Sequence, residues 1–176
     1  MMKIKDKQFE VYLPQARIEE RIGQLANELD NDYRDKDPLV IGVLNGSLYF
    51  LSGITLAMEK EVEIAMIRYQ SYEGTQSSGT FKVSLPFEDN VRGRDILLVE
   101  DIVDTGRTLE RLQQDLKSME PASVQIVSLL LKPDVFKGRF PVKYVGFEIP
   151  GKFVLGYGLD YDGRGRNLRD IYVLSE

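Results

Sequence analysis

Residues 95 to 119 hold the pattern that most constrains the fold. An apolar run at 96 to 99 ends in two adjacent carboxylates, Glu100 and Asp101, and a third, Asp104, follows. Apolar residues then recur at helical spacing, at Leu109, Leu112, Leu116 and Met119. This order predicts a buried strand, a polar turn and an amphipathic helix. Such a unit is typical of α/β proteins with a mainly parallel central sheet flanked by helices.

The rest of the chain repeats this alternation. Pro14 opens a helical pattern, a helix is expected from about 48 to 60, and a polar, glycine-bearing loop at 71 to 80 is expected to be mobile. Strands are expected at residues 39–44, 61–69, 81–85, 95–99, 124–131, 144–149, 153–158 and 171–174. The strands on either side of the loop predict an extended hairpin. With no linker or repeat, we expect a single domain over 1–176.

Composition excludes several chemistries. The chain has no Cys and no His, so thiolate nucleophiles, zinc–thiolate sites and imidazole bases are absent. Acid–base work falls to Asp, Glu, Lys or Tyr, and a bound metal is expected to be a hard cation such as Mg²⁺. A net charge of −5 without a basic run argues against a nucleic-acid partner. The charged N-terminus and the lack of a long apolar run predict a cytoplasmic protein without a membrane partner.

The turn after the 95–99 strand predicts an anion site. Backbone N–H groups of residues 104 to 108 lead into a helix N-terminus, which favours a phosphate. Thr105 and Thr108 offer hydroxyls, Arg107 a positive charge, and Gly106 close backbone approach. The acidic pair would repel a phosphate, so it is expected to face sugar hydroxyls or magnesium. A phosphoribosyl group that carries pyrophosphate fits these demands.

Residues 99 to 109, Val-Glu-Asp-Ile-Val-Asp-Thr-Gly-Arg-Thr-Leu, resemble the phosphoribosyl-pyrophosphate motif of type I phosphoribosyltransferases. Over nearly its whole length the chain is similar to the hypoxanthine-guanine branch of that family. The resemblance implies the type I fold, with a small hood built from the N-terminal segment and residues about 140–176, and a flexible hairpin lid at about 70–80. It also implies that Glu100, Asp101 and residues 104–108 bind the phosphoribosyl group.

The resemblance assigns the other ligand contacts residue by residue. The pyrophosphate site is implied to contain Leu44, Asn45, Gly46, Ser71, Tyr72 and Arg166. The family usually has Lys at the position of Asn45, and often a cis peptide before it. The purine site is implied to contain Lys132, Phe153, Val154 and Asp160, with Lys132 on the exocyclic 6-oxygen and Phe153 stacked on the ring. Magnesium is implied at Glu100, Asp101 and Asp160.

The implied reaction is purine salvage. A purine N9 displaces pyrophosphate from phosphoribosyl pyrophosphate, with hypoxanthine giving IMP and guanine GMP. Asp104 is the acid–base candidate and faces N7 of the purine. Family members are commonly dimers or tetramers.

Two alternatives stay open at this point. A regulator on the same fold that binds RNA would require a basic face. A transferase that prefers xanthine or a pyrimidine is the other alternative, since Lys132 and Phe153 suit any 6-oxopurine, xanthine included.

Overall fold

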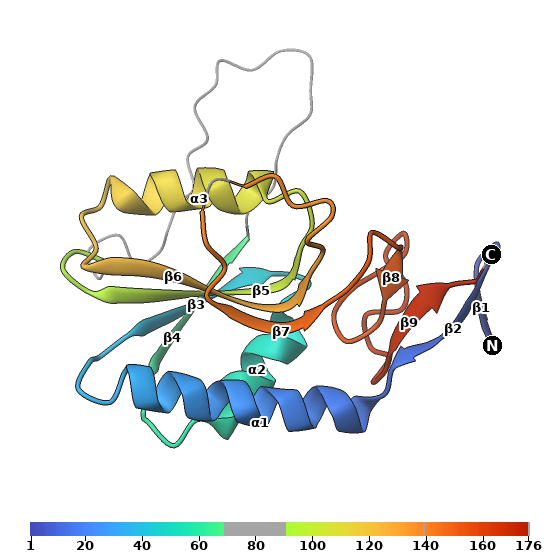
Figure 1. Ribbon diagram of the computed structural model, residues 1–176, viewed down its shortest axis with the longest axis horizontal. Coiled ribbons are helices and arrows are strands. Elements are labelled where there is room, and N and C mark those ends of the chain that lie inside the picture. The colour runs from blue at the N-terminus through green and yellow to red at the C-terminus, as the bar shows by residue number, and fades with distance from the viewer. Residues whose placement is uncertain (69–90, 139, 176) are drawn as a thin grey trace, which may run out of the picture.

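Two sheets organise the chain in the computed structural model, which describes residues 1–68, 91–138 and 140–175 (Figure 1). The central sheet contains five strands in the order β4-β3-β5-β6-β7. Its strands are β3 (Leu39–Leu44), β4 (Glu63–Arg68), β5 (Asp95–Val103), β6 (Ser123–Leu131) and β7 (Tyr144–Glu148). Every neighbouring pair is parallel. The predicted α/β architecture is therefore confirmed.

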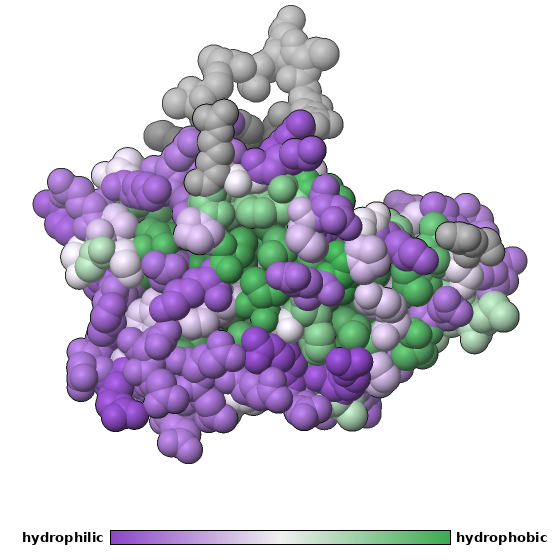
Figure 2. Space-filling view, viewed as in Figure 1, coloured by the Kyte–Doolittle hydropathy of each residue, from purple (hydrophilic) through white to green (hydrophobic). Residues whose placement is uncertain are grey.

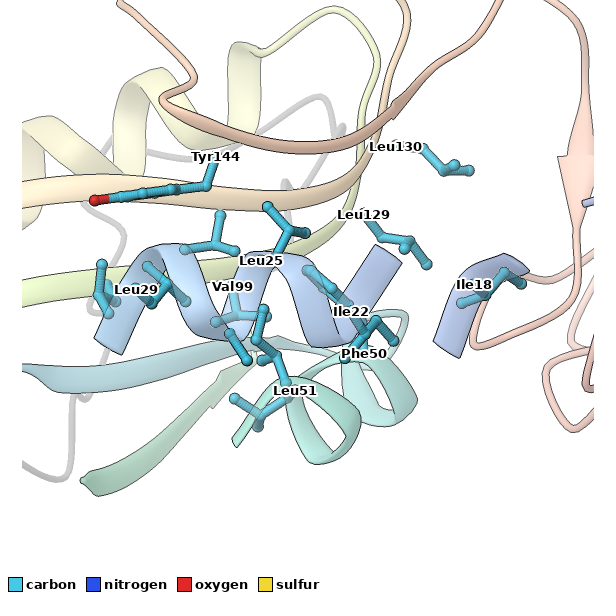
Figure 3. Packing of buried hydrophobic residues seen from close by; sticks show 14 of the residues in the cluster. Ile18, Ile22, Leu25, Leu29, Phe50, Leu51, Val99, Leu129, Leu130 and Tyr144 are labelled. Carbon is cyan, nitrogen blue, oxygen red and sulfur yellow. The ribbon is translucent and has the colours of Figure 1, made fainter. Parts of the chain in front are cut away.

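Three helices cover the two faces of this sheet. α1 (Gln15–Asp32) and α2 (Leu48–Ala57) lie on one face, and α3 (Arg107–Lys117) lies on the other (Figure 1). The apolar stripe of α1, with Ile18, Ile22, Leu25 and Leu29, packs against Phe50 and Leu51 of α2 and against sheet residues (Figure 3). On the other face, Leu109, Leu112 and Leu116 of α3 pack with Ile96, Leu98 and Ile126. Two apolar layers thus hold the sheet rigid.

The second sheet, which we call the small sheet, is antiparallel and joins the two ends of the chain. Its order is β1 (Met2–Ile4), β2 (Lys7–Leu13), β9 (Ile171–Leu174) and β8 (Val154–Leu155). β1 and β2 were not expected as strands. The segment 140–176 was assigned to the hood, but β7 pairs with β6 in the central sheet, so the C-terminal contribution to the small sheet begins at β8. The small sheet lies beyond one end of the central sheet (Figure 1).

Several element boundaries differ from the expectation. β5 continues to Val103, so Glu100 and Asp101 lie within the strand rather than after it. α2 ends at Ala57, where Met58 adopts an extended conformation, instead of continuing to residue 60. In β4, Ala65 and Ile67 pack toward the core, whereas Ile64 and Met66 are exposed. The expected lid and the 81–85 strand fall outside the described residues.

The surface along α1 is hydrophilic, and apolar residues show mainly in the band between α1 and α3 (Figure 2). No helix within the described ranges has the length and apolar character required to cross a membrane.

Candidate functional site

The register between β5 and β6 places Asp104 next to Lys132. Val103 and Leu131 are paired residues, and Asp104 and Lys132 directly follow them. The Lys132 Nζ lies 2.9 Å from Asp104 Oδ2, and Lys132 is only 7% exposed. A buried ammonium needs such a partner, because an unpaired charge is costly in a low-dielectric interior. The carboxyl ends of these strands therefore present a carboxylate and a cation side by side.

Glu100 and Asp101 form an acidic pair within β5, just before Asp104 in the chain. The Oε2 atom of Glu100 is buried and has no hydrogen-bond partner among the described residues. Burial raises the pKa of Glu100 well above its usual range, and the charge of Asp101 raises it further. Burial also raises the pKa of Asp101 to about 6, although the bond from the Ile102 N–H opposes that rise. Burial outweighs the compensating charge near the pair, so hydroxyl donors or a cation would stabilise it.

The turn after β3 reaches across to this acidic pair. The Leu44–Asn45 peptide is cis, with Asn45 in place of the family's usual Lys. The buried Ser47 hydroxyl donates to the Val43 carbonyl at 2.6 Å. A Cβ on Gly46 would overlap the Asp101 carboxylate, and a Cβ on Gly158 would overlap the Gly46 carbonyl. Gly46 is thus enclosed between the central sheet and the segment that follows β8.

That segment brings Asp160 and Arg166 to the same region. The Arg166 guanidinium pairs with Asp160 Oδ1 at 2.5 Å and donates to the Gly158 carbonyl at 2.7 Å. Asp160 Oδ2 accepts a bond from the Gly163 N–H at 2.7 Å. The positive charge of Arg166 also acts on Asp101, where it lowers the pKa against the larger effect of burial. Arg166 is therefore close enough to the acidic pair to serve one ligand with it.

The start of α3 provides the predicted anion turn. Gly106 caps the helix with φ of 79°, a left-handed conformation that suits glycine. The first N–H groups of the helix have no intrahelical partner and project outward beyond its N-terminal end. Beside them lies an open pocket of about 690 Å³, lined by Thr105, Arg107, Glu110, Val135 and Lys137. Thr108 is half-buried in the first turn of α3.

The remaining predicted residues divide by location. Phe153 is 41% exposed at the start of β8, whereas the neighbouring Val154 is buried in the core. Ser71 and Tyr72 lie outside the described residues. The close packing of Gly158 against the Gly46 turn was not predicted. The glycine-rich sequence around Gly156 and Gly158 was a visible signal, but its contact with the Gly46 turn depends on tertiary structure.

The donor atoms fit a magnesium ion only in part. Across the part of the chain that the structure describes, no three carboxylates gather closely enough to hold a metal alone. Glu100 and Asp101 nevertheless offer two carboxylates, one with an unpartnered oxygen. Magnesium commonly takes one or two carboxylates and completes its shell with water and phosphate oxygens. The residues therefore fit a magnesium ion that a phosphorylated ligand shares.

Substituting Gly46 tests the close packing of the turn. We expect Gly46→Ala to destabilise the protein by about 1–3 kcal/mol, because its Cβ overlaps the Asp101 carboxylate. Gly23→Ala is the matched control, since nothing lies within 4 Å of its Cβ in α1, and it should stabilise the helix by about 0.5–1 kcal/mol. Urea unfolding measures both changes. Equal stability of Gly46→Ala and the wild type would contradict the packing.

Substituting Glu100 tests the cost of the acidic pair. The raised pKa values of Glu100 and Asp101 mean that the folded protein holds protons more tightly, so its stability falls as pH rises from about 4 through 6 and beyond. Without ligands, Glu100→Gln should be more stable than the wild type at pH 7.5, by about 1–2 kcal/mol, and less so at pH 5.

Urea unfolding at the two pH values gives the comparison, with Glu148→Gln, an exposed carboxylate at the end of β7, as the control. A loss of stability in Glu100→Gln at pH 7.5 would show that the acidic pair does not lower the free energy of unfolding.

Comparison with known proteins identifies the family of this chain. The family model for the phosphoribosyl transferase domain matches residues 9–162. The hypoxanthine-guanine phosphoribosyltransferase of Bacillus subtilis is 40% identical over 94% of this chain and 92% of its own length. That of Aquifex aeolicus is 34% identical over the full length of both chains. The crystal structure of a hypoxanthine phosphoribosyltransferase from Staphylococcus aureus superposes with a TM-score of 0.87 and 36% identity, over 97% of this chain and 92% of the other.

The matched segment includes β5, the anion turn, β6 and the Asp160 segment, so it spans most of the residues gathered here. Identity above 30% over nearly complete chains goes beyond a shared fold. The chain therefore belongs to the hypoxanthine-guanine branch of the phosphoribosyltransferase family.

Proposed function

We propose that this protein transfers the 5-phosphoribosyl group of phosphoribosyl pyrophosphate to N9 of hypoxanthine or guanine, forming IMP or GMP and releasing pyrophosphate. The observation that carries the proposal is the contact between the buried Lys132 and the half-exposed Asp104 at the strand ends, next to the turn at the start of α3. A cation and a carboxylate in contact match the 6-oxygen and the N7 proton of an oxopurine. The names of the similar proteins support the same assignment.

The phosphoribosyl group is proposed to lie across the ends of β3 and β5. Its 5′-phosphate binds the free N–H groups at the start of α3, with the Thr105 and Thr108 hydroxyls and the Arg107 charge nearby. Glu100 and Asp101 accept hydrogen bonds from the ribose hydroxyls. The diphosphate binds N–H groups of the Leu44–Asn45–Gly46 turn and the guanidinium of Arg166, which exchanges part of its contact with Asp160 for phosphate oxygens.

Asp104 and Lys132 act on the purine. As N9 bonds to C1′ of the ribose, the C1′–oxygen bond breaks and its electron pair leaves with pyrophosphate. The Asp104 carboxylate accepts the proton from N7, a role that needs no histidine. The Lys132 ammonium, held at 2.9 Å from Asp104, donates to the exocyclic 6-oxygen. An adenine amino group would place a donor against this ammonium, which disfavours adenine.

Glu100 and Asp101 are the residues that would hold a magnesium ion, and Asp160 would bind magnesium at a second position, because no three carboxylates of the described residues gather around one ion. When bound, the ion neutralises the negative charge that builds up on the leaving pyrophosphate. The small sheet, with Phe153 and Val154 at β8, is proposed to form the hood over the purine, and Ser71 and Tyr72 to belong to the lid. The cytoplasmic location stays a prediction.

A second copy of the chain is the proposed partner of an apolar surface on α2 and β4. Leu56 is 84% exposed on α2, while Ile64 and Met66 of β4 are 46% and 48% exposed. Ala65 and Ile67 point toward the α3 side of the sheet, so Ile64 and Met66 share the side that α2 covers. Leu48 and Tyr49 of α2 are exposed as well. Large apolar side chains that are exposed on neighbouring elements are typical of a contact between subunits.

The oligomer is tested by charging this surface. We expect the wild type to sediment as a dimer or larger species, and the double variant Leu56→Lys/Met66→Lys to shift toward monomer, because two charges would be buried in the contact. Val11→Lys, at a 51% exposed position of the small sheet, is the control and should not change sedimentation. A monomeric wild type would refute the proposed contact.

The function itself is tested by incubating the protein with magnesium, phosphoribosyl pyrophosphate and each of hypoxanthine, guanine, xanthine and adenine. IMP and GMP should form, and AMP should not. We expect Asp104→Asn to lower kcat for hypoxanthine by about 100-fold or more, with KM for phosphoribosyl pyrophosphate changed only a few-fold.

Asp134→Asn, an exposed carboxylate two residues after Lys132, is the control and should keep wild-type turnover. Absence of IMP with the wild type would refute the function, whereas full turnover by Asp104→Asn would refute only the role of Asp104.

A further inference from the structure

Two aromatic rings, those of Phe9 and Tyr161, contact the exposed Phe153. Its ring centroid lies 6.3 Å from that of Phe9 and 5.8 Å from that of Tyr161, and the Phe153 and Tyr161 planes meet at 80°. Phe9 and Tyr161 are themselves 6.2 Å apart, which closes the triangle. The Phe153–Tyr161 pair is edge-to-face, an arrangement that restricts the orientation of a ring, whereas the two pairs with Phe9 are tilted. Phe9 is fully buried, so it gives the cluster a fixed base, while Phe153 keeps an exposed surface.

Tyr161 is held in this cluster from outside the rings. Its hydroxyl donates to Asp6 Oδ1 at 2.9 Å, and its N–H and carbonyl both bond to Arg164. The Lys7 ammonium lies 4.9 Å from the Tyr161 centroid and 5.9 Å from that of Phe153, within the range of a cation–π contact. Lys5 pairs with Asp162. The β1–β2 hairpin therefore contacts the segment after β8 through three consecutive residues, 5 to 7.

Tyr161 is also adjacent in sequence to a predicted ligand-binding residue. It directly follows Asp160, whose two carboxylate oxygens bond Arg166 and the Gly163 N–H. Tyr161 thus connects Phe153, the ring expected to stack on the purine, with the Asp160–Arg166 pair, which is expected to contact the pyrophosphate. Asp6 and Lys7, more than 150 residues earlier, stabilise that connection.

We propose that Tyr161 is a positioning residue that sets the orientation of Phe153 for stacking on the purine, a role that rests on the proposed function. A ring that is already oriented loses less conformational freedom when the base binds. Removing the Tyr161 ring leaves Phe153 free to turn about its side-chain bonds. The affinity for the base then falls. The phosphoribosyl pyrophosphate site keeps its affinity, because most of it lies at the ends of β3 and β5 and the start of α3, and the backbone bonds between Tyr161 and Arg164 that hold the Asp160 segment do not involve the ring.

The test measures kcat and the KM of each substrate for the full-length protein. Tyr161→Leu should raise KM for hypoxanthine roughly fivefold, as expected for loss of one aromatic pair, with KM for phosphoribosyl pyrophosphate within about twofold of the wild type. Tyr161→Phe keeps the ring and loses only the bond to Asp6, so it should restore most of the affinity for the base. In a Phe153→Leu background, Tyr161→Leu should add nothing further.

Lys5→Ala is the control for general loosening, because it frees Asp162 from the hairpin and leaves every ring in place. It should leave both KM values unchanged. If Tyr161→Leu fails to fold, Lys7→Met makes the same test by removing the cation from both rings, with an expected rise of roughly twofold in KM for hypoxanthine alone.

The inference is overturned if an active wild type and Tyr161→Leu share the same KM for hypoxanthine, or if both KM values rise together. It is also overturned if Tyr161→Leu and Phe153→Leu effects simply multiply. A wild type that makes no IMP at all contradicts the proposed function instead, so the two failures are distinguishable.

Discussion

The parallel pairing of β5 with β6 is the contact on which the rest of the site depends. It aligns Val103 with Leu131, and the chain leaves both strands at the same level with Asp104 and Lys132 in contact. A shift of the register by one residue would turn every side chain of one strand to the other face. The two apolar layers forbid that shift, since Ile96 and Leu98 pack toward α3 while Leu97 and Val99 pack toward α1 and α2. Core packing thus fixes the distance between two polar groups that lie beyond it.

The same architecture tolerates an acidic pair that opposes folding. Glu100 and Asp101 lie within a strand, in an environment that raises the pKa of each. Their carboxylates have little compensating charge nearby apart from Arg166, which is itself engaged with Asp160. A functional site often keeps such unfavourable groups because the ligand supplies the missing partners. The proposed role of these two side chains thus links the stability of the unliganded protein to its affinity for a hydroxylated ligand.

Much of the central sheet was predictable, because the apolar runs at residues 39–44 and 124–131 and the helical stripe of α3 are local signals. The anion turn was also predictable, since Thr105 and Gly106 precede a helix in the printed sequence. The end of β5 was misplaced because Glu100 and Asp101 are residues that strands disfavour, and parallel pairing to β6 overrides that preference. β1 was missed because it has only three residues, and β2 because its partner β9 lies more than 150 residues away. The Lys132–Asp104 contact and the enclosure of Gly46 depend on how strands and loops meet, which no local pattern encodes.

The small sheet constrains the order in which parts of the chain can fold during synthesis. β2 pairs with β9, so the strand made among the first residues cannot find its neighbour until residues 171–174 have left the ribosome. All five strands of the central sheet precede residue 149, so they can pair on the emerging chain, as N-terminal parts generally do. The aromatic cluster around Phe153 joins Phe9 to Tyr161 and therefore belongs to the late stage. A nascent chain thus passes through a period in which the turn proposed to bind phosphate has formed, while the ring proposed to stack on the base still lacks one of its aromatic neighbours.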